Sequence, residues 1–242
     1  QLAQCFPSDQ VSMIYNGIDT PKLTPIDLRA IYALPAGLPV LCAVGRLVHA
    51  KGFDVLLEAI DGLPVSLLIA GDGAERAALQ QRLDTLSPIT QVRLLGHQAN
   101  AMTLMSSADG VVIASRREGF SYVCIEALLS GTRILSTDVP VANEILAADL
   151  IVPADDSVAL RAKLVALLND TAHWDSQMLA PRRQAQSSMS LAHMRDQTLA
   201  VYSRLKHSRL STGTRISRTC GDAPEILTES QSLGQPQVRG DV

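Results

Sequence analysis

An alternation of short apolar runs with longer amphipathic stretches constrains the fold of this chain more than any other feature of its sequence. The apolar runs lack polar alternation, which is typical of strands buried on both faces of a parallel sheet. They occupy residues 39–44, 65–70, 92–94, 110–114, 133–136 and 150–152. Stretches with apolar residues at helical spacing lie at 53–60, 74–86, 101–107, 122–129 and 157–168. The pattern predicts an α/β fold with a Rossmann-like, doubly wound parallel sheet of about six strands.

The predicted sheet domain, residues 38–169, is flanked by segments of different character. We interpret residues 1–37, which contain several prolines, as an interdomain linker with the first elements. Residues 170–207 contain polar helical segments. Residues 208–242 are rich in Ser, Thr, Gly and Pro with little periodicity, which predicts a disordered tail. Because doubly wound sheets bind ligands where their strands end, the loops after the strands are the candidate site.

The charge and cysteine content exclude several classes of protein. The net charge of −3, without a run of Lys and Arg interleaved with aromatic residues, argues against nucleic acid as a partner. Cys5, Cys42, Cys124 and Cys220 form no Cys-x-x-Cys pair, which indicates reduced thiols and no structural zinc. No apolar stretch approaches the roughly 20 residues that span a bilayer. We therefore expect a cytoplasmic protein.

The strongest local signal is a loop and helix that carry two glutamates. Glu118 follows a strand, whereas Glu126 lies inside a helix that starts near Ser121 and ends at Gly131, a residue favoured just past a helix end. The backbone N–H groups at the helix start form an anion site. Glu126 lies roughly 7 Å further along the axis. This offset suits a nucleotide whose diphosphate lies at the helix start and whose ribose lies beside Glu126.

An alternative interpretation makes Glu118 a solvated loop charge and Glu126 an exposed helix residue. The sequence around Glu126 argues against it, because a charge within an apolar helical stretch is unfavourable without a partner. We expect Cys124, in the same stretch, to be a small core residue rather than a nucleophile. His49 and His97 each stand alone on a loop, and we expect neither to be catalytic.

A second signal lies after the first strong strand, where Gly45-Arg46 is followed by Lys51-Gly52. Two cations in one strand-to-helix loop can converge on a diphosphate, Arg46 through a bidentate fork and Lys51 as a mobile point charge. The alternative is a pair of solvated loop cations. The loop lacks the Gly-x-Gly-x-x-Gly and Walker lysine patterns, which disfavours a dinucleotide-binding or P-loop enzyme.

Together these segments resemble the C-terminal, donor-binding domain of family 4 glycosyltransferases, which are retaining enzymes with the GT-B fold. The resemblance covers residues 15–169 and rests on the order and spacing of several pieces. They are Asn16-Gly17-Ile18-Asp19, Gly45-Arg46 with Lys51-Gly52, Ala70-Gly71-Asp72-Gly73, Leu94-Leu95-Gly96-His97, Glu118 with Glu126, and Gly131-Thr132. The chain would then be one half of a GT-B enzyme.

The resemblance also implies catalytic roles. Arg46 and Lys51 would bind the donor diphosphate and stabilise its growing charge as the glycosidic bond breaks. Glu118 would contact the donor sugar, a role closer to positioning than to proton transfer. Glu126 would bind the ribose. The two-carboxylate scheme of glycoside hydrolases does not fit these assignments.

Further donor contacts are implied for backbone groups near the helix start and for a second loop. These residues are Gly71, Gly119, Phe120, Ser121 and Tyr122, with Gly71 and the segment after Gly96 lining the base. Ser121 and Tyr122 stand where the family frequently has a glycine and a small or aliphatic residue. This departure puts the choice of sugar in doubt.

The implied reaction transfers a hexosyl group from a nucleoside diphosphate sugar, UDP- or GDP-linked, to a hydroxyl of a glycan or lipid-linked acceptor, without a metal or other cofactor. A missing N-terminal domain or partner chain would bind the acceptor, so the isolated half is not expected to turn over. The start at Gln1 indicates a processed product, a fragment or an incomplete sequence. The setting would be polysaccharide or lipopolysaccharide biosynthesis, in the cytoplasm or peripherally at the inner face of the membrane. Two alternatives stay open: a non-catalytic nucleotide-sugar-binding subunit and a nucleotide-sugar epimerase of the same fold.

Overall fold

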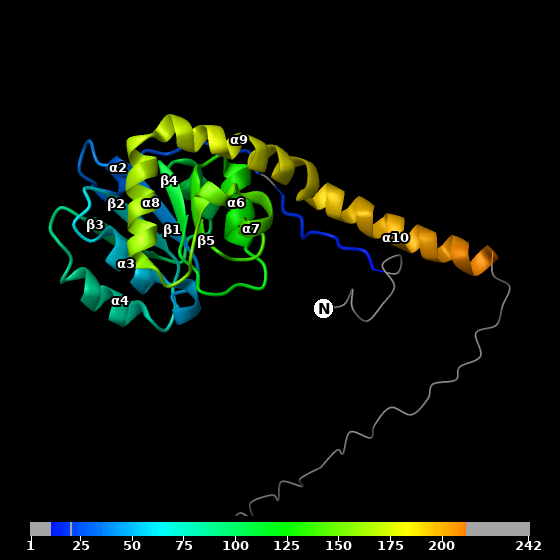
Figure 1. Ribbon diagram of the computed structural model, residues 1–242, viewed down its shortest axis with the longest axis horizontal. Coiled ribbons are helices and arrows are strands. Elements are labelled where there is room, and N and C mark those ends of the chain that lie inside the picture. Colours follow the sequence, from blue (N-terminus) through cyan, green and yellow to red (C-terminus); the bar gives the residue numbers. More distant parts are fainter. Residues whose placement is uncertain (1–10, 20, 212–242) are drawn as a thin grey trace, which may run out of the picture. The chain divides into compact units, whose positions relative to one another are not determined.

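The computed structural model describes residues 11–19 and 21–211. The centre of this part of the chain is a six-stranded parallel sheet in the order β3-β2-β1-β4-β5-β6, with helices on both faces (Figure 1). The strands are β1 (Val40–Val44), β2 (Ser66–Ala70), β3 (Gln91–Gly96), β4 (Gly110–Ile113), β5 (Ile134–Thr137) and β6 (Ile151–Val152). The predicted α/β fold with a doubly wound parallel sheet is therefore confirmed.

The strand order places the topological switch point between β1 and β4. The chain winds outward from β1 through β2 to β3, returns across the sheet to β4, and then winds outward in the other direction. Leu41 pairs with Gly110 and Cys42 pairs with Val111 at this central junction. The loops that leave β1 and β4 diverge there, and such a crevice is where this class of fold binds its ligands.

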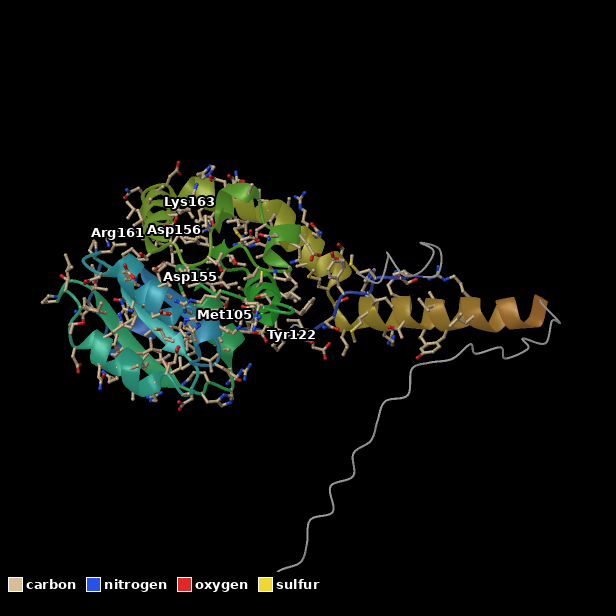
Figure 2. The ribbon with its side chains drawn as sticks, turned by 60° about the horizontal axis from the view of Figure 1, so that its bottom comes forward. Met105, Tyr122, Asp155, Asp156, Arg161 and Lys163 are labelled. Carbon is tan, nitrogen blue, oxygen red and sulfur yellow. The ribbon has the colours of Figure 1, made fainter. Side chains whose placement is uncertain are left out.

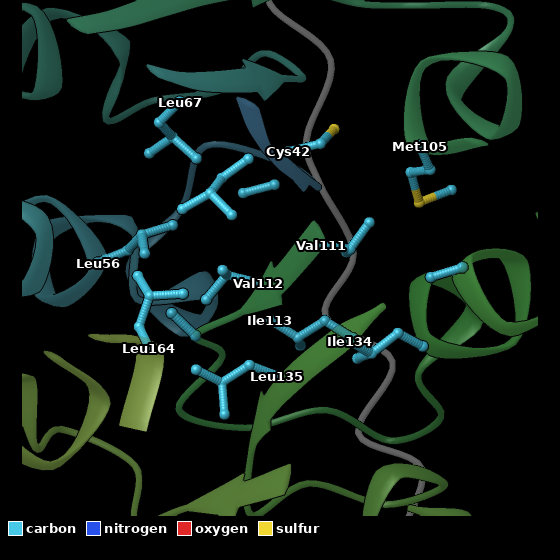
Figure 3. Close-up of a cluster of buried hydrophobic side chains, with 14 of the residues drawn as sticks. Cys42, Leu56, Leu67, Met105, Val111, Val112, Ile113, Ile134, Leu135 and Leu164 are labelled. Carbon is cyan, nitrogen blue, oxygen red and sulfur yellow. The ribbon is translucent and has the colours of Figure 1, made fainter. Parts of the chain in front are cut away.

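The helices form a layer on each face of the sheet. On one face α3 (Phe53–Ile60) packs beside α8 (Ser157–Asn169), and on the other α5 (Ala101–Ser106) packs beside α6 (Tyr122–Ser130). Figure 3 shows Leu56 of α3 and Leu164 of α8 on one side of the strands and Met105 of α5 on the other. The remaining helices are α2 (Leu28–Tyr32), α4 (Arg76–Leu83), α7 (Ala142–Ile145), α9 (Thr171–Ser188) and α10 (Leu191–Ser211).

The core forms because the strands are apolar on both faces. Val111 and Val112 are successive residues of β4, are both buried, and point toward opposite layers of helices (Figure 3). Trp174 of α9 is fully buried at the amino edge of the sheet, where its Nε1–H donates to the carbonyl oxygen of Ile134 (2.9 Å). A Cβ at Gly110 would lie 2.6 Å from the Trp174 ring, so that only glycine fits there.

The ends of α4 differ from the prediction of residues 74–86. Ahead of the helix, the N–H of Glu75 donates to the carbonyl of Leu47 (2.9 Å), which keeps this residue in the loop. After Leu83, the N–H groups of Thr85 and Leu86 donate to carbonyls three residues earlier, a tighter turn that ends the α-helix. The other helices expected within the sheet domain agree with the structure to within one residue at each end.

The segments that flank the sheet contact each other around Ile18. Ile18 forms a parallel bridge with Ser190, which follows α9, and the N–H of Gly17 donates to Sδ of Met194 (3.2 Å). The contacts divide the chain into two units at Tyr202, and of the second unit the structure describes only the end of α10. This helix reaches Ser211, past the start of the predicted tail, and residues 212–242 lie outside the described part of the chain. None of the described helices combines the length and apolar character that crossing a membrane requires.

Candidate functional site

The loops after β1 and β4 enclose a hollow of about 350 Å³ at the carboxyl edge of the sheet. Its lining comes from two segments far apart in the sequence: Gly45, Arg46, Val48, Ala50 and Lys51 on one side, and Arg117, Glu118, Gly119 and Phe120 on the other. The structure therefore brings together all three residues predicted to be catalytic. Gly119 and Phe120, predicted to contact the donor, lie in the same wall.

The two walls approach closely because Gly52 has no side chain. Gly52 is in the left-handed conformation (φ 62°), and a Cβ there would lie 2.0 Å from the carbonyl oxygen of Ala114, where β4 ends. The N–H of Arg116 then donates to the carbonyl of Ala50 (2.9 Å). The loop that carries Lys51 is thus held against the loop that carries Glu118.

Lys51 and Glu118 form an ion pair across the hollow. The Nζ of Lys51 lies 3.0 Å from the Oε1 of Glu118, and only 6% of the Glu118 side chain is exposed. The hydroxyl of Ser115 donates to the same Oε1 (2.6 Å). Glu118 is therefore a buried, paired carboxylate, and the alternative of a solvated loop charge is wrong.

Two other cations of the hollow have no such partner. Arg46 and Arg117 are both exposed, and the side chain of neither makes a hydrogen bond or ion pair with any described residue. Arg117 was not predicted to have a role, although its place directly before Glu118 is a usable signal. The lining of the hollow thus contains three cations and one carboxylate, Glu118. This excess of positive charge favours the binding of an anion.

The N-terminus of α6 contains an unused polar group. Ser121 is the N-cap residue and is fully buried, yet its hydroxyl caps no N–H group of the helix and has no hydrogen-bond partner. A buried hydroxyl without a partner is unfavourable, and a helix start carries a partial positive charge. Both conditions would be relieved by a bound anion such as a phosphate.

Glu126 lies in the second turn of α6, within the apolar stretch anticipated from the sequence. It is half-buried, and burial raises the pKa of its carboxyl above the ordinary value. Its side chain makes no hydrogen bond or ion pair within the described part of the chain. The alternative of a fully exposed helix residue is therefore wrong, and the carboxylate is open to a ligand.

The other residues predicted to contact the donor lie around the hollow rather than in its lining. Gly71 follows β2, and a Cβ there would lie 1.8 Å from the carbonyl oxygen of Gly45. Its N–H donates to the carbonyl of Gly96 (2.8 Å), which joins the two loops expected near the base. Tyr122 is 46% exposed at the start of α6 (Figure 2), and its ring packs edge-on against that of Phe120 (5.0 Å between centroids).

Cys124, the third residue of α6, is poorly suited to act as a nucleophile. Cys124 is fully buried, as expected, and burial together with the charge of Glu118 raises the pKa of its thiol to about 12. His49 and His97 are exposed on their loops. The described residues contain no group of three or more His, Cys, Asp or Glu side chains that could hold a metal ion.

Comparison with known proteins identifies the family. Residues 26–185 match the family of glycosyl transferases group 1. This match covers most of the chain, including the whole sheet and both walls of the hollow. The chain belongs to the glycosyl transferases group 1 family.

Two relatives illustrate the range of the similarity. The lipopolysaccharide core biosynthesis glycosyltransferase LpsE of Rhizobium meliloti is 34% identical over 129 residues, which are 53% of this chain and 38% of LpsE. The phosphatidyl-myo-inositol mannosyltransferase of Mycobacterium leprae is 36% identical over 176 residues, 67% of this chain and 45% of that protein. The chain thus spans less than half the length of these relatives.

A solved structure shows the same fold. HepE of Anabaena, crystallised with UDP, superposes with a TM-score of 0.73 at 21% identity, over 84% of this chain and 60% of HepE. The six-stranded sheet of this chain therefore has the architecture found in GT-B glycosyltransferases.

Proposed function

We propose that this chain is the donor-binding, C-terminal half of a retaining family 4 glycosyltransferase, which transfers a hexosyl group from a nucleoside diphosphate sugar to an acceptor hydroxyl. The observation that carries the proposal is the hollow between the loops after β1 and β4. Its exposed arginines have no partner among the described residues, and the start of α6 beside it holds a buried hydroxyl without one. These groups suit the charge of a diphosphate.

In the proposed mechanism, electrostatic stabilisation of the leaving diphosphate does most of the catalytic work. Arg46 and Lys51 face the diphosphate from the β1 loop, and Arg117 adds a third cation from the opposite wall. Lys51 is already held by its ion pair with Glu118 before the ligand arrives, so little reorganisation of this cation is needed as charge develops in the transition state. No metal ion has a role in this scheme.

Glu118 is proposed to orient the donor sugar. Its carboxylate is fixed by Lys51 and by the hydroxyl of Ser115, and it remains an acceptor for a sugar hydroxyl. When the diphosphate binds, Lys51 has two anions within reach and links the sugar contact to the phosphate contact. Glu126, half-buried and without a partner in the described structure, is proposed to accept hydrogen bonds from the ribose.

The acceptor and the setting are proposed from the relatives. LpsE is named for lipopolysaccharide core biosynthesis, and the Mycobacterium leprae relative for mannosyl transfer to a phosphatidylinositol. We infer a glycan or lipid-linked acceptor, bound by an N-terminal domain or partner chain and used at the inner face of the membrane. UDP is the first nucleoside diphosphate to test, because the HepE structure contains it.

A thermal-shift panel of UDP, GDP, ADP and their sugars tests donor binding. A ligand at one hundred times its dissociation constant adds about 2.7 kcal/mol to the free energy of unfolding. We expect one base to give a clear rise in Tm, and the absence of any rise would contradict the proposal. Retention is tested on the full-length enzyme by the anomeric configuration of its product.

A further inference from the structure

One arginine, Arg116, joins the two walls of the hollow without lining it. Its Nη1 donates to the carbonyl oxygen of His49 (2.7 Å) and to Oδ1 of Asp54 (2.8 Å), and its Nη2 donates to Oδ2 of Asp54 (2.7 Å). Its backbone N–H donates to Ala50 (2.9 Å). A residue that follows β4 is therefore bonded to the chain on both sides of Lys51.

Arg116 also reaches a third segment. Its Nε donates to the carboxylate of Asp155, in the turn before α8 (Figure 2). Asp155 adopts a left-handed conformation (φ 59°), which aspartate enters more readily than most residues other than glycine. The Arg116 side chain is only 15% exposed, so these bonds lie largely out of water.

We propose that Arg116 is a positioning residue, which holds the ammonium of Lys51 and the carboxylate of Glu118 at their 3.0 Å separation. Glu118 lies two residues after Arg116, and Lys51 lies between Ala50 and Asp54, so both are connected to Arg116 through short stretches of chain. A planar guanidinium that donates to His49, Asp54 and Asp155 fixes orientation as well as distance, which a lysine cannot do.

The role of Arg116 in ligand binding rests on the proposed function, whereas its effect on the Lys51–Glu118 pair does not. The pair can be examined in the ligand-free chain by the rate at which acetic anhydride acetylates Lys51, with Lys163 as the internal reference. Lys163 forms its own ion pair with Asp149 and lies far from this loop in sequence. The ratio of the two rates, measured by peptide mass spectrometry, reports the ion pair and not the overall stability.

The matched control is Arg133, which binds Asp175 through Nε (2.9 Å) and Nη2 (2.7 Å). We expect Arg116→Met to raise the Lys51 to Lys163 ratio by about tenfold, because Lys51 then loses its charge-assisted hydrogen bond to Glu118. Arg133→Met should leave the ratio unchanged while lowering Tm to a similar extent. An unchanged ratio in Arg116→Met, or equal rises in both variants, would overturn the proposal.

Two milder variants keep the test decisive if Arg116→Met does not fold, as judged by circular dichroism. Asp54→Asn weakens the bond beside Lys51, and Asp155→Asn weakens the bond to the distant turn. We expect the larger rise in Lys51 acetylation for Asp54→Asn, because Asp54 adjoins the Lys51 loop. Wild-type ratios in both variants would overturn the proposal.

The consequence for binding is measured by calorimetry with whichever of UDP, GDP and ADP gives the largest thermal shift. We expect Arg116→Met to weaken binding about tenfold in the wild-type background and about twofold or less in a Lys51→Met background. Fully additive losses would overturn a role that acts through Lys51. If no diphosphate binds the wild-type chain but Lys51 becomes reactive in Arg116→Met, the proposed function fails and the positioning role stands.

Discussion

The two edges of the sheet both have arginine-lined cavities of similar size, but the arginines are used differently. At the amino edge a cavity of about 250 Å³ is lined by Arg29 and Arg133. Arg29 pairs with Asp109 (3.3 Å) and Arg133 with Asp175 (2.7 Å), so that each cation there has a carboxylate partner. At the carboxyl edge, Arg46 and Arg117 have none among the described residues.

This difference shows why a cavity and a cluster of positive charge do not by themselves identify a ligand site. The amino-edge arginines hold the fold together, and a ligand there would have to displace a carboxylate. The carboxyl-edge arginines, with the unpaired Ser121 hydroxyl nearby, leave charge and hydrogen-bonding capacity for a ligand. The free energy available for binding lies where the fold does not satisfy its own polar groups.

The largest expected effect is on diphosphate binding. Removing both predicted phosphate cations, with Arg46→Met and Lys51→Met combined, should weaken binding by roughly 3 kcal/mol or more, since each charge-assisted hydrogen bond contributes about 1.5–3 kcal/mol. Calorimetry with the diphosphate found in the thermal-shift panel measures this. The matched double variant at the amino edge, Arg29→Met with Arg133→Met, should lower Tm and leave the affinity of the folded protein unchanged. Equal losses of affinity would remove the distinction between the edges.

A second comparison concerns two glycines in the left-handed conformation, one at each edge. Gly52→Ala should lower the free energy of unfolding by about 3 kcal/mol, because the backbone is strained and the new Cβ meets the Ala114 carbonyl at 2.0 Å. A Cβ at Gly37, just before β1, would have no atom within 4 Å. Gly37→Ala should therefore lower the free energy of unfolding only by the strain of the left-handed backbone, about 1 kcal/mol. Urea denaturation measures both. Similar losses would show that close packing of the two loops does not matter.

The same contrast explains what could be predicted from the sequence. Strands and helices were predictable because apolar periodicity is local, and their alternation predicted a doubly wound parallel sheet. The lining of the hollow was partly predictable, because carboxyl-end loops in such a sheet converge. Arg46, Lys51 and Glu118 were singled out on that basis.

The pairing of side chains was not predictable, and Arg116 and Arg117 show why. They are adjacent and chemically identical, yet Arg116 is held by Asp54 and Asp155, which are 62 and 39 residues away in sequence. Arg117 has no partner in the described structure. Whether a charged residue holds the fold or faces a ligand depends on contacts between distant segments, to which local patterns are insensitive.

The two glutamates of the site are expected to bind different parts of the donor. Glu126→Gln should weaken both the plain diphosphate and the nucleotide sugar by about 1.5–3 kcal/mol, the range for a hydrogen bond to a charged group. Glu118→Gln should weaken the intact donor and leave the plain diphosphate almost unaffected. Calorimetry on both variants with both ligands gives the four affinities needed. Equal losses for Glu118→Gln with the two ligands would contradict its assignment to the sugar.

The smallest expected effect is the pH dependence of stability. It should have one sign for Asp175, at the amino edge, and the opposite sign for Glu126, at the carboxyl edge. The hydrogen bonds from Arg133 lower the pKa of Asp175 in the folded chain. Ionised Asp175 therefore stabilises the fold above its pKa in the unfolded chain, about 3.9, and this stability is lost as pH falls through its lower pKa in the folded chain. Burial raises the pKa of Glu126 in the folded chain. The fold therefore loses stability as pH rises from the pKa of Glu126 in the unfolded chain, about 4.3, through its higher pKa in the folded chain.

Where both carboxylates are ionised in the folded chain, neutral variants should shift Tm in opposite directions. Asp175→Asn should lower the Tm of the ligand-free chain, whereas Glu126→Gln should raise it by removing a half-buried charge that has no partner in the described structure. Differential scanning calorimetry at pH 7 and pH 4 tests this: the Glu126→Gln shift should diminish at pH 4, whereas the Asp175→Asn shift should persist, because the folded pKa of Asp175 lies lower still. A lower Tm for Glu126→Gln at pH 7 would show that this carboxylate stabilises the fold, and it would then no longer be the group left open for a ligand.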